Sequence, residues 1–333
     1  MKLAVAGRKV QDEIAAHNGK PCDCFCRFSS VASSDMYEPT TQVKCACIEK
    51  GGVTISSPNE TKMEGQISEP FDPSRYRYNY PEKSRYRVAD YGLILALDAG
   101  DKASFNESEP STWRDVSRGG ASQIEAKIQG AVALETELGG GSLRFGPNDG
   151  DRAIVSGMDI SPNRFRDLTI EVWVRLENAD SSVRGWVVGN DDGNSTTSSS
   201  GRSLIANDPR FSPEGTEGGA SAISANGAYV STFGAAPTEK WMQLVGVWQQ
   251  GRTSYLYRNG NRDVASSETN NEIGIPDLVL GGHATMSGMN MDGEIALVRV
   301  YSRALTVKEI KGNFCFSASR FDLHCPSDWG SEN

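Results

Sequence analysis

The chain has 333 residues, of which 38% are hydrophobic and 23% charged, the composition of a folded protein and not of a disordered one. Its 43 acidic and 34 basic side chains give a net charge of −9, which argues against a general binder of polyanions. No apolar run approaches the roughly 18–20 residues that a membrane helix needs, and the N-terminus is too poor in apolar residues for a secretory signal. The length allows two domains, or one large sandwich with an appendage.

Residues 1–50 predict a short helix followed by a cysteine-rich hairpin. Apolar residues recur at spacings of three and four over 1–19, and so short a helix must pack on its own domain or on a partner. The following sequences CDCFCRF and QVKCACIE have the pattern of two paired strands, in which every second residue shares a face.

Five of the seven cysteines fall in this hairpin, and the other two lie near the C-terminus. They are Cys22, Cys24, Cys26, Cys45, Cys47, Cys315 and Cys325. Three interpretations stay open: disulfides in an oxidising compartment, buried thiols, or a zinc site, although C-x-C pairs are not the usual C-x2-C zinc knuckle. The odd number leaves at least one thiol unpaired or bonded to another chain.

Residues 51–90 predict a linker and then an attachment segment. Residues 51–70 are polar and interrupted by Gly and Pro. The sequence RYRYNYPEKSRYRVADY that follows interleaves Arg with Tyr, which suits nucleic acid, a protein interface or an ordinary edge strand. Residues 71–90 hold five basic and three acidic side chains, so a protein partner is favoured over nucleic acid. The candidate partner-binding residues are Arg75, Tyr76, Arg77, Tyr78, Tyr80, Arg85 and Tyr86.

From Gly92 onward the pattern predicts an antiparallel β-sandwich. Alternation over Leu168–Leu176 indicates a strand with one buried face, whereas Trp241–Trp248 is apolar on both faces. Asn259-Gly260 predicts a type I′ hairpin turn, and only residues 306–314 look helical. Further short strands are predicted at RAIVSGM, GWVVGND, RSLIAND, GAYVSTF, TSYLYRNG, DLVLGGH and GEIALVRVY.

The order of these pieces resembles the laminin G-like, concanavalin A-like jelly-roll domains. The matching pieces are GLILALDAGD with TWRDVS, GGSLRFGPNDGDRAIVS, LTIEVWVRL, EKWMQLVGVWQQGRTSYLYRNGN and MDGEIALVRVYSRALTVKEIKGNF. The resemblance implies an all-β antiparallel sandwich over residues 91–314, with a tail at 315–333. It also implies the class of function, because the opening LDAGD and TWRDVS and the closing NFCFSASRF are similar to modules in structural proteins of tailed viruses.

We therefore expect a non-catalytic structural or decoration component of a large assembly, and a virion is the favoured assembly. The expected contacts of the sandwich are with proteins or glycans. An extracellular glycan-binding adhesion module and an accessory subunit of a cellular complex are the alternatives. The expected partners are other protein subunits, with surface glycans as a further option, and neither nucleic acid nor membrane insertion is expected.

Catalytic residues are not apparent. Glycoside hydrolysis in this fold needs two carboxylates that flank the scissile bond. Glu171 has no second carboxylate on its face, and Asp292 and Glu294 begin a strand where the resembled family has a turn. The three histidines lie in separate segments, and each is expected at the surface or in packing. We expect no enzyme.

Two ligand sites are predicted in the sandwich. Trp173 and Trp186 are candidates for stacking on sugar rings, and Trp173 is the better exposed candidate, although packing against the edge of the second sheet or the N-terminal part is favoured for it. Asp191, Asp192 and Asn194 offer the oxygen ligands that calcium prefers, with a solvated turn as the alternative. No other cofactor is expected, apart from zinc at the N-terminal cysteines.

Overall fold

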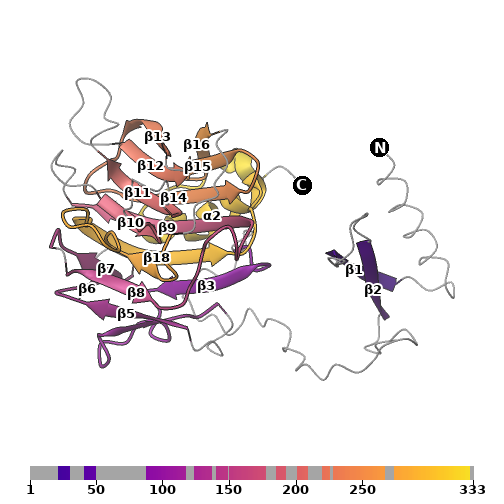
Figure 1. Cartoon of the computed structure of the whole chain (residues 1–333), viewed down its shortest axis with the longest axis horizontal. Coiled ribbons are helices and arrows are strands. Elements are labelled where there is room, and N and C mark those ends of the chain that lie inside the picture. The colour runs from indigo at the N-terminus through magenta and orange to yellow at the C-terminus, as the bar shows by residue number, and fades with distance from the viewer. Residues whose placement is uncertain are drawn as a thin grey trace. The chain divides into compact units, whose positions relative to one another are not determined.

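The computed structural model describes residues 22–30, 41–49, 88–117, 124–136, 140–148, 150–177, 185–192, 201–208, 220–225, 228–266 and 274–330. The chain divides into two compact units, residues 1–69 and 70–333 (Figure 1). In the first unit the described residues form a β-hairpin. In the second they form a β-sandwich with helices at its C-terminal end.

The hairpin of the first unit pairs β1 (Cys22–Ser30) with β2 (Thr41–Glu49) in antiparallel register. Cys24 lies opposite Cys47, Cys26 opposite Cys45, and Cys22 opposite Glu49. The hairpin predicted for residues 20–50 is confirmed in the described residues. The helix predicted within 1–19 and the linker at 51–70 lie outside them.

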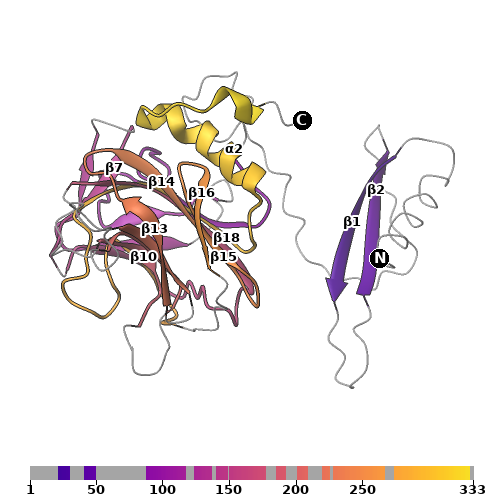
Figure 2. The ribbon, with the colours of Figure 1, turned by 90° about the horizontal axis from the view of Figure 1, so that it is seen from above.

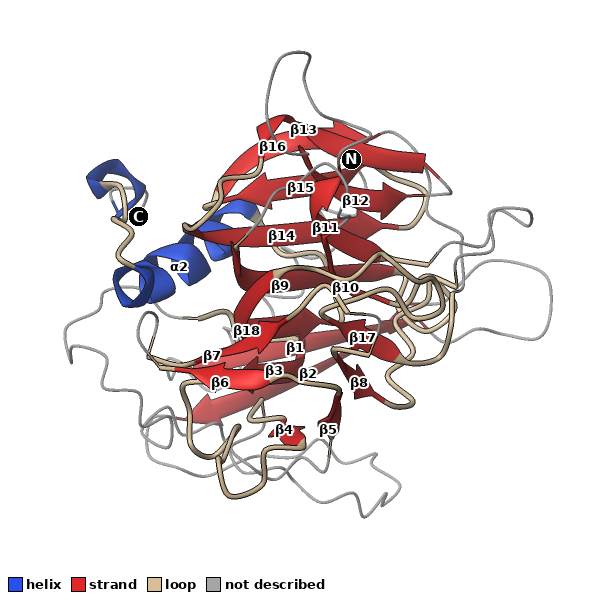
Figure 3. Ribbon diagram, turned by 90° about the vertical axis from the view of Figure 1, so that its left-hand side faces the viewer, coloured by secondary structure: helices blue, strands red, loops and turns tan. Residues whose placement is uncertain are grey.

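The sandwich consists of two eight-stranded sheets in the described residues (Figure 3). One, the β9 sheet, has the order β16 (Asn261–Ser266), β15 (Ser254–Arg258), β14 (Trp241–Gln249), β9 (Asp167–Leu176), β18 (Gly293–Tyr301), β7 (Ser142–Phe145), β6 (Ala133–Glu135), with β3 (Leu93–Asp98) also paired to β18. The other, the β10 sheet, has the order β13 (Ala228–Ala235), β12 (Ala220–Ala225), β11 (Ser203–Asp208), β10 (Gly185–Gly189), β17 (Leu278–Leu280), β8 (Arg152–Val155), β5 (Glu125–Gln129), β4 (Thr112–Arg114).

Helices follow the last strand without a long connection. They are α2 (Val307–Ser317) and two 3₁₀ helices, η3 (Ala318–Phe321) and η4 (Ser327–Gly330). The helix predicted at 306–314 is therefore confirmed and longer than expected. None of the helices among the described residues is long and apolar enough to span a bilayer.

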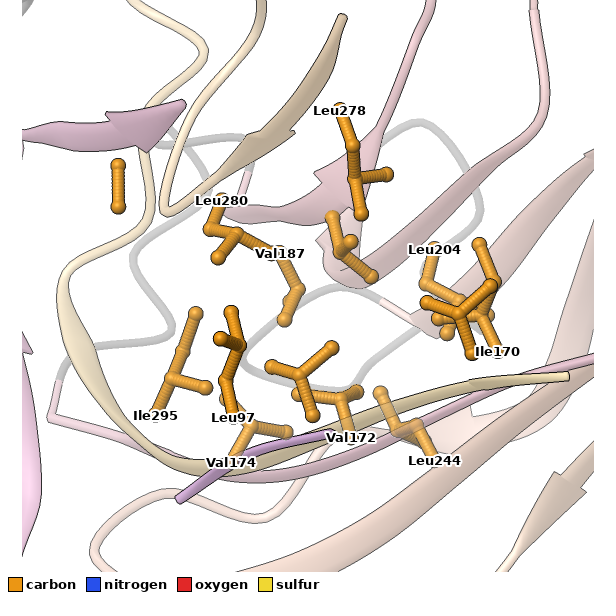
Figure 4. Close-up of a cluster of buried hydrophobic side chains, with 14 of the residues drawn as sticks. Leu97, Ile170, Val172, Val174, Val187, Leu204, Leu244, Leu278, Leu280 and Ile295 are labelled. Atoms are coloured by element: carbon orange, nitrogen blue, oxygen red, sulfur yellow. The ribbon is translucent and has the colours of Figure 1, made fainter. Parts of the chain in front are cut away.

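The main core lies between the two sheets (Figure 4). Leu97, Val172, Val174 and Ile295 from the β9 sheet face inward, toward a second layer from the β10 sheet. That second layer includes Val187, Leu204, Leu278 and Leu280. Alternate residues of these strands supply the core, as expected when two sheets pack face to face. The predicted all-β antiparallel sandwich is confirmed.

The two central strands differ in how well their burial was predicted. β14 is buried on both faces from Trp241 to Trp248, as its sequence indicates. β9 was expected to have one exposed face, and that expectation is wrong, because nearly every residue of the strand is buried. The second face of β9 is covered by the C-terminal helices, whose contacts with it are polar as well as aromatic.

The hairpin turn after β15 has the predicted geometry. Asn259 and Gly260 both have positive φ, at 50° and 74°, as a type I′ turn requires. The Asn259 side chain also accepts a hydrogen bond from the backbone N–H of Gln243 at 2.9 Å, so the turn is fastened to β14.

Gly246 provides a test of the packing between the sheets. A Cβ atom added there would lie 2.5 Å from the Trp248 ring and 2.9 Å from Leu204 Cδ2. The Trp248 ring cannot readily move aside, because its Nε1–H donates to Ser224 O at 2.7 Å. We expect Gly246→Ala to lower the free energy of unfolding by about 1–3 kcal/mol, as overpacking does. Urea denaturation measures this change.

Gly150→Ala is the matched control, because a Cβ at Gly150 meets no atom within 4 Å. We expect it to change the free energy of unfolding by less than about 0.5 kcal/mol. Equal effects of the two substitutions would contradict the packing described here.

Candidate functional site

The outer face of the β9 sheet is covered by α2 (Figure 2). The helix begins with a capping box, in which Thr306 Oγ1 accepts from Glu309 N and the Glu309 carboxylate accepts from Thr306 N. Arg303, just before the helix, donates to both Glu309 oxygens, at 2.9 and 2.5 Å. These bonds hold the pKa of Glu309 at about 2, well below its ordinary value. The sequence of the corner therefore fixes where α2 starts and the direction in which it leaves the sheet.

A buried ion pair lies beneath this helix. The Glu171 side chain on β9 is fully buried, and Arg299 on the adjacent β18 donates to its Oε1 at 3.0 Å. Gln243 on β14 donates to the same oxygen at 2.8 Å. Asn313 on α2 donates to Glu171 Oε2 at 2.7 Å. One carboxylate thus joins three neighbouring strands to the helix that covers them.

Asn313 extends this network to the start of the sandwich. Its Nδ2 also contacts Tyr301 Oη at 3.0 Å, and its Oδ1 accepts from the backbone N–H of Ala89 at 2.8 Å. Burial, together with the negative charge of Glu171, raises the pKa of Tyr301 far above its ordinary value. The phenol therefore stays protonated, and it fills the gap between β18 and α2 as a neutral polar group.

Aromatic packing seals the same face beside the ion pair. The Trp173 ring stacks on Phe321 with centroids 4.2 Å apart and on Phe314 at 5.7 Å. A disulfide joins Cys315 to Cys325 with their Cα atoms 4.8 Å apart, which ties α2 to the segment that follows it. For these two cysteines, the disulfide interpretation is therefore the correct one.

Trp173 is 0% exposed, so it is wrong as a candidate for stacking on sugars, and the favoured interpretation of a packed ring is correct, although the C-terminal helices supply the cover. The physical reason is that α2 and the residues after it fold back over the Trp173 ring. Residues 315–330 therefore pack against the sandwich and do not form a separate tail. A sugar has no access to this ring in the described structure.

The opening and closing motifs of the sandwich also contact one another. Arg320 Nη1 donates to Asp98 Oδ2 at 2.7 Å, and its Nη2 donates to Gly141 O at 3.0 Å. Asp115, in the TWRDVS sequence, accepts from the backbone N–H groups of Ala96 and Ser117 at 2.7 and 2.8 Å. The residues that carry the family resemblance thus make folding contacts with each other.

The carboxylates weighed as catalytic candidates also have structural partners. Glu294 is bound by Arg175, and its Oε2 accepts from Ser142 Oγ at 2.5 Å. Asp292 Oδ1 accepts from Arg144 at 2.9 Å. Together with the buried Glu171, they hold strands of the β9 sheet in place, and their ion pairs leave them poorly suited to act on a substrate.

A second cluster lies on the outer face of the β10 sheet. It brings together residues from segments that are far apart in the sequence. The His283 ring lies edge-on to Trp186, with centroids 4.5 Å apart, and its Nε2 is 3.5 Å from Asp191 Oδ1. The three side chains are 2–3% exposed. Asp192 contributes its backbone oxygen, which accepts from Thr285 Oγ1 at 2.7 Å. We call these residues the Trp186 cluster.

The hydrogen bonds of His283 limit its chemistry. Nδ1 accepts from the backbone N–H groups of Thr285 and Met286, both at 3.1 Å, so the ring proton is on Nε2, facing Asp191. A ring with this tautomer has no free lone pair with which to take a proton from a substrate. The cluster is arranged to hold the loop after β17 and not to transfer protons.

The predicted calcium ligands are only partly described. Asp191 and Asp192 belong to the Trp186 cluster, whereas Asn194 lies outside the described residues. Within the described part of the chain, no three side chains of His, Cys, Asp and Glu gather as a metal site would require. Calcium binding at this loop stays a prediction.

The candidate partner-binding residues Arg75, Tyr76, Arg77, Tyr78, Tyr80, Arg85 and Tyr86 lie outside the described residues. The end of the same segment is described. Tyr91 is 78% exposed, and the Arg303 guanidinium lies 5.2 Å from its ring centroid. The Arg/Tyr segment therefore joins the sandwich at the corner where β18 turns into α2.

Two antiparallel sheets, a core between them and a C-terminal helix on the outer face define the chain as a jelly-roll sandwich of the concanavalin A-like class. Residues 129–311 match a laminin G family model described as the concanavalin A-like lectin/glucanases superfamily. This match covers more than half of the chain, which therefore belongs to that family. No curated protein sequence matches the chain.

Several solved structures have a similar fold at low identity. A Trypanosoma rangeli sialidase complex is 16% identical over 70% of this chain and 33% of its own, with a TM-score of 0.47. The binding domain of botulinum neurotoxin serotype D/C VPI 5993 is 15% identical over 68% of this chain and 51% of its own, with a TM-score of 0.48. This chain thus spans only a third to a half of those proteins.

Domain 4 of AbnA, an extracellular GH43 arabinanase from Geobacillus stearothermophilus, was solved with arabinotriose. It is 13% identical over 68% of this chain and 98% of its own, with a TM-score of 0.45. Similarities this distant carry no argument about what the present chain binds.

The buried ion pair is directly testable. Glu171→Gln replaces one carboxylate oxygen with an NH2 group, so Gln243 and Asn313 no longer each have an acceptor, and Arg299 is left charged and buried without a carboxylate. We expect the free energy of unfolding to fall by about 3–5 kcal/mol, as it does when one partner of a buried ion pair is removed. Guanidinium denaturation measures this change.

Glu177→Gln is the matched control, because Glu177 is half exposed and pairs with Arg144 near the end of the same strand. We expect a loss below about 1 kcal/mol for such a surface pair. If Glu171→Gln cost no more than the control, Glu171 would not join the strands to α2.

The Trp186 cluster gives a second prediction for this site. His283→Ala removes the acceptor of two partly buried backbone N–H groups together with the buried ring that packs edge-on to Trp186, and a loss of such contacts costs about 1–3 kcal/mol. We expect a loss of that size in thermal or urea unfolding. His324→Ala is the control, because His324 is exposed, and it should stay within about 0.5 kcal/mol of the unmodified chain. Equal stability of both variants would contradict a structural role for His283.

Proposed function

We propose that this chain is a non-catalytic structural component of a large assembly, which displays the sandwich and attaches it through the residues before Val88. The main support for this proposal is that the outer face of the β9 sheet is not open to a ligand. That face is filled by the chain's own C-terminal helices, with Glu171, Trp173 and Tyr301 all fully buried beneath them. A module that closes this face with its own chain has to make its contacts elsewhere.

The chemistry of the described side chains supports a role without catalysis. Glu171 and Glu294 form ion pairs with arginines. Both ring nitrogens of His283 have partners within the chain, Nε2 at Asp191 and Nδ1 at the backbone N–H of Thr285. The motifs that define the family serve the fold. What remains for function is the N-terminal quarter of the chain and the loops.

The junction of the two parts supports attachment through the N-terminal side. Residues 1–69 and residues 70–333 are two compact units. The second unit begins with a segment rich in Arg and Tyr, which are enriched at protein interfaces. Its last tyrosine, Tyr91, is the most exposed large hydrophobic side chain of the described residues. A virion is the assembly that we favour, on the resemblance of the opening and closing pieces to modules of tailed-virus structural proteins.

An extracellular glycan-binding module is the second candidate. Its support is the membership of a family described as lectins and glucanases, together with the Cys315–Cys325 disulfide, because disulfides persist in oxidising surroundings. For this candidate the binding surface would lie on the sandwich itself and not on its N-terminal attachment.

A truncation separates the two candidates. The chain should begin at Val88, because Ala89 donates to Asn313 and belongs to the sandwich. We expect this chain to unfold at the same denaturant concentration as the whole protein, yet to co-sediment with the isolated assembly at least about tenfold less, as loss of an interface hot spot would cause. Undiminished co-sedimentation would contradict attachment through residues 1–87. Glycan-array binding by the truncated chain would instead support the second candidate.

Substitutions in the full chain sharpen this test. Alanine at Arg75, Tyr76, Arg77 and Tyr78 should weaken co-sedimentation in the same direction as the truncation. The control replaces two exposed basic residues of the sandwich, Lys102 and Arg252, with alanine. It should leave co-sedimentation unchanged, and a loss as large as in the first variant would show that only overall charge matters.

A further inference from the structure

The register of the β1–β2 hairpin selects among the pairings open to its cysteines. Cys24 is directly opposite Cys47, and Cys26 is directly opposite Cys45. Residues two apart along a strand share a face, and so do residues directly opposite each other across an antiparallel pair. The backbone therefore assigns these four cysteines, and Cys22 with them, to one face of the hairpin.

Distances typical of antiparallel strands separate the direct pairs from all others. Directly opposed residues have Cα atoms about 4.5 or 5.5 Å apart, depending on their place in the hydrogen-bond ladder. Both values lie inside the range of roughly 4.4–6.8 Å that disulfides need. Diagonal neighbours, such as Cys24 with Cys45 or Cys26 with Cys47, are about 7–8 Å apart and fall outside that range.

Pairing along a single strand is also unfavourable. Residues two apart rise by about 6.6–6.8 Å, which is at the upper limit for a disulfide, and their Cα–Cβ bonds run side by side without converging. Four cysteines allow three connectivities in principle. In this register, only the one that joins directly opposed cysteines has suitable geometry throughout.

We propose that two cross-strand disulfides, Cys24–Cys47 and Cys26–Cys45, staple the hairpin, and that Cys22 keeps its thiol because Glu49 stands opposite it. The Cys315–Cys325 disulfide supports this choice, since conditions that oxidise one pair in the folded chain also oxidise thiols held directly opposite each other. A two-stranded hairpin is marginally stable by itself, so the staples also account for how so small an element keeps its shape. The proposal does not depend on the attachment function.

The chemistry needs an oxidant, for which a small-molecule disulfide such as oxidised glutathione suffices. One cysteine thiolate attacks the glutathione disulfide and releases one glutathione as its thiol. The opposite cysteine thiolate then attacks the resulting mixed disulfide and releases the second glutathione. Each staple thus removes two protons and two electrons from the protein and reduces one glutathione disulfide to two thiols.

Counting thiols tests the proposal on the full chain. The protein is equilibrated with a glutathione redox buffer, denatured without reductant and labelled with a maleimide, and the labels are counted by intact mass. With three disulfides among seven cysteines, we expect one label per chain, at Cys22. Five labels per chain, which would mean that only Cys315–Cys325 had formed, would overturn the proposal. So would one bound zinc ion per chain by elemental analysis of the untreated protein.

Two double variants test the connectivity. Cys24→Ser with Cys47→Ser removes one directly opposed pair, and we expect the remaining pair to form, so that one label per chain is again found. Cys24→Ser with Cys45→Ser is the matched control, which leaves Cys26 and Cys47 on a diagonal, and we expect three labels per chain. The same label count for both variants would overturn the pairing that the register selects.

Discussion

The ion pair between Glu171 and Arg299 determines how the rest of the sandwich is arranged. A carboxylate in the middle of a sheet is costly to bury unless its charge is paired and its oxygens accept hydrogen bonds. Here the partners come from β14, β18 and α2, and Asn313 carries the network on to Ala89. The sheet and the helix therefore depend on each other, because Asn313 on α2 supplies one of the hydrogen bonds that the buried Glu171 carboxylate requires.

This arrangement supports the structural, non-catalytic role proposed for the sandwich. In a two-sheet fold an outer sheet face can be left open to a ligand or covered by the chain. This chain covers the face over β9 with two kinds of contact, the polar network around Glu171 and the aromatic stack on Trp173, and it fastens the cover with a disulfide.

Much of the fold could be predicted from the sequence, because its strongest signals are local. The both-sided apolar pattern of β14, the Asn259-Gly260 turn and the helix at 306–314 depend on neighbouring residues, and each was predicted from its pattern. Strands with weak alternation were missed, among them β12, which consists of Ala, Ser and one Ile, and β16, which is largely polar. Both pair with strands next to them in the chain, so they were missed because their sequences lack a clear alternation of apolar and polar residues.

The cover over Trp173 and the contact between His283 and Asp191 could not be predicted, for a related reason. The parity that placed Trp173 beside Thr169 and Glu171 on a polar face was correct, but the sequence of β9 says nothing about what lies above it. The covering residues, among them Asn313, Phe314 and Phe321, lie at the other end of the chain. His283 and Asp191 are some 90 residues apart, and no local pattern joins them.

The corner at which the sandwich begins has a mechanical consequence. The chain enters through Ala89 and Tyr91, which are held by Asn313 and by Arg303, so a pull on the preceding segment first loads those two contacts. Both lead into α2 and the buried network, and β3 lies behind them with its backbone bonds to β18 running across the strand. A pull directed along β3 would load its hydrogen bonds to β18 in shear, so that they would have to break together, whereas a pull directed across the strand would break them one after another.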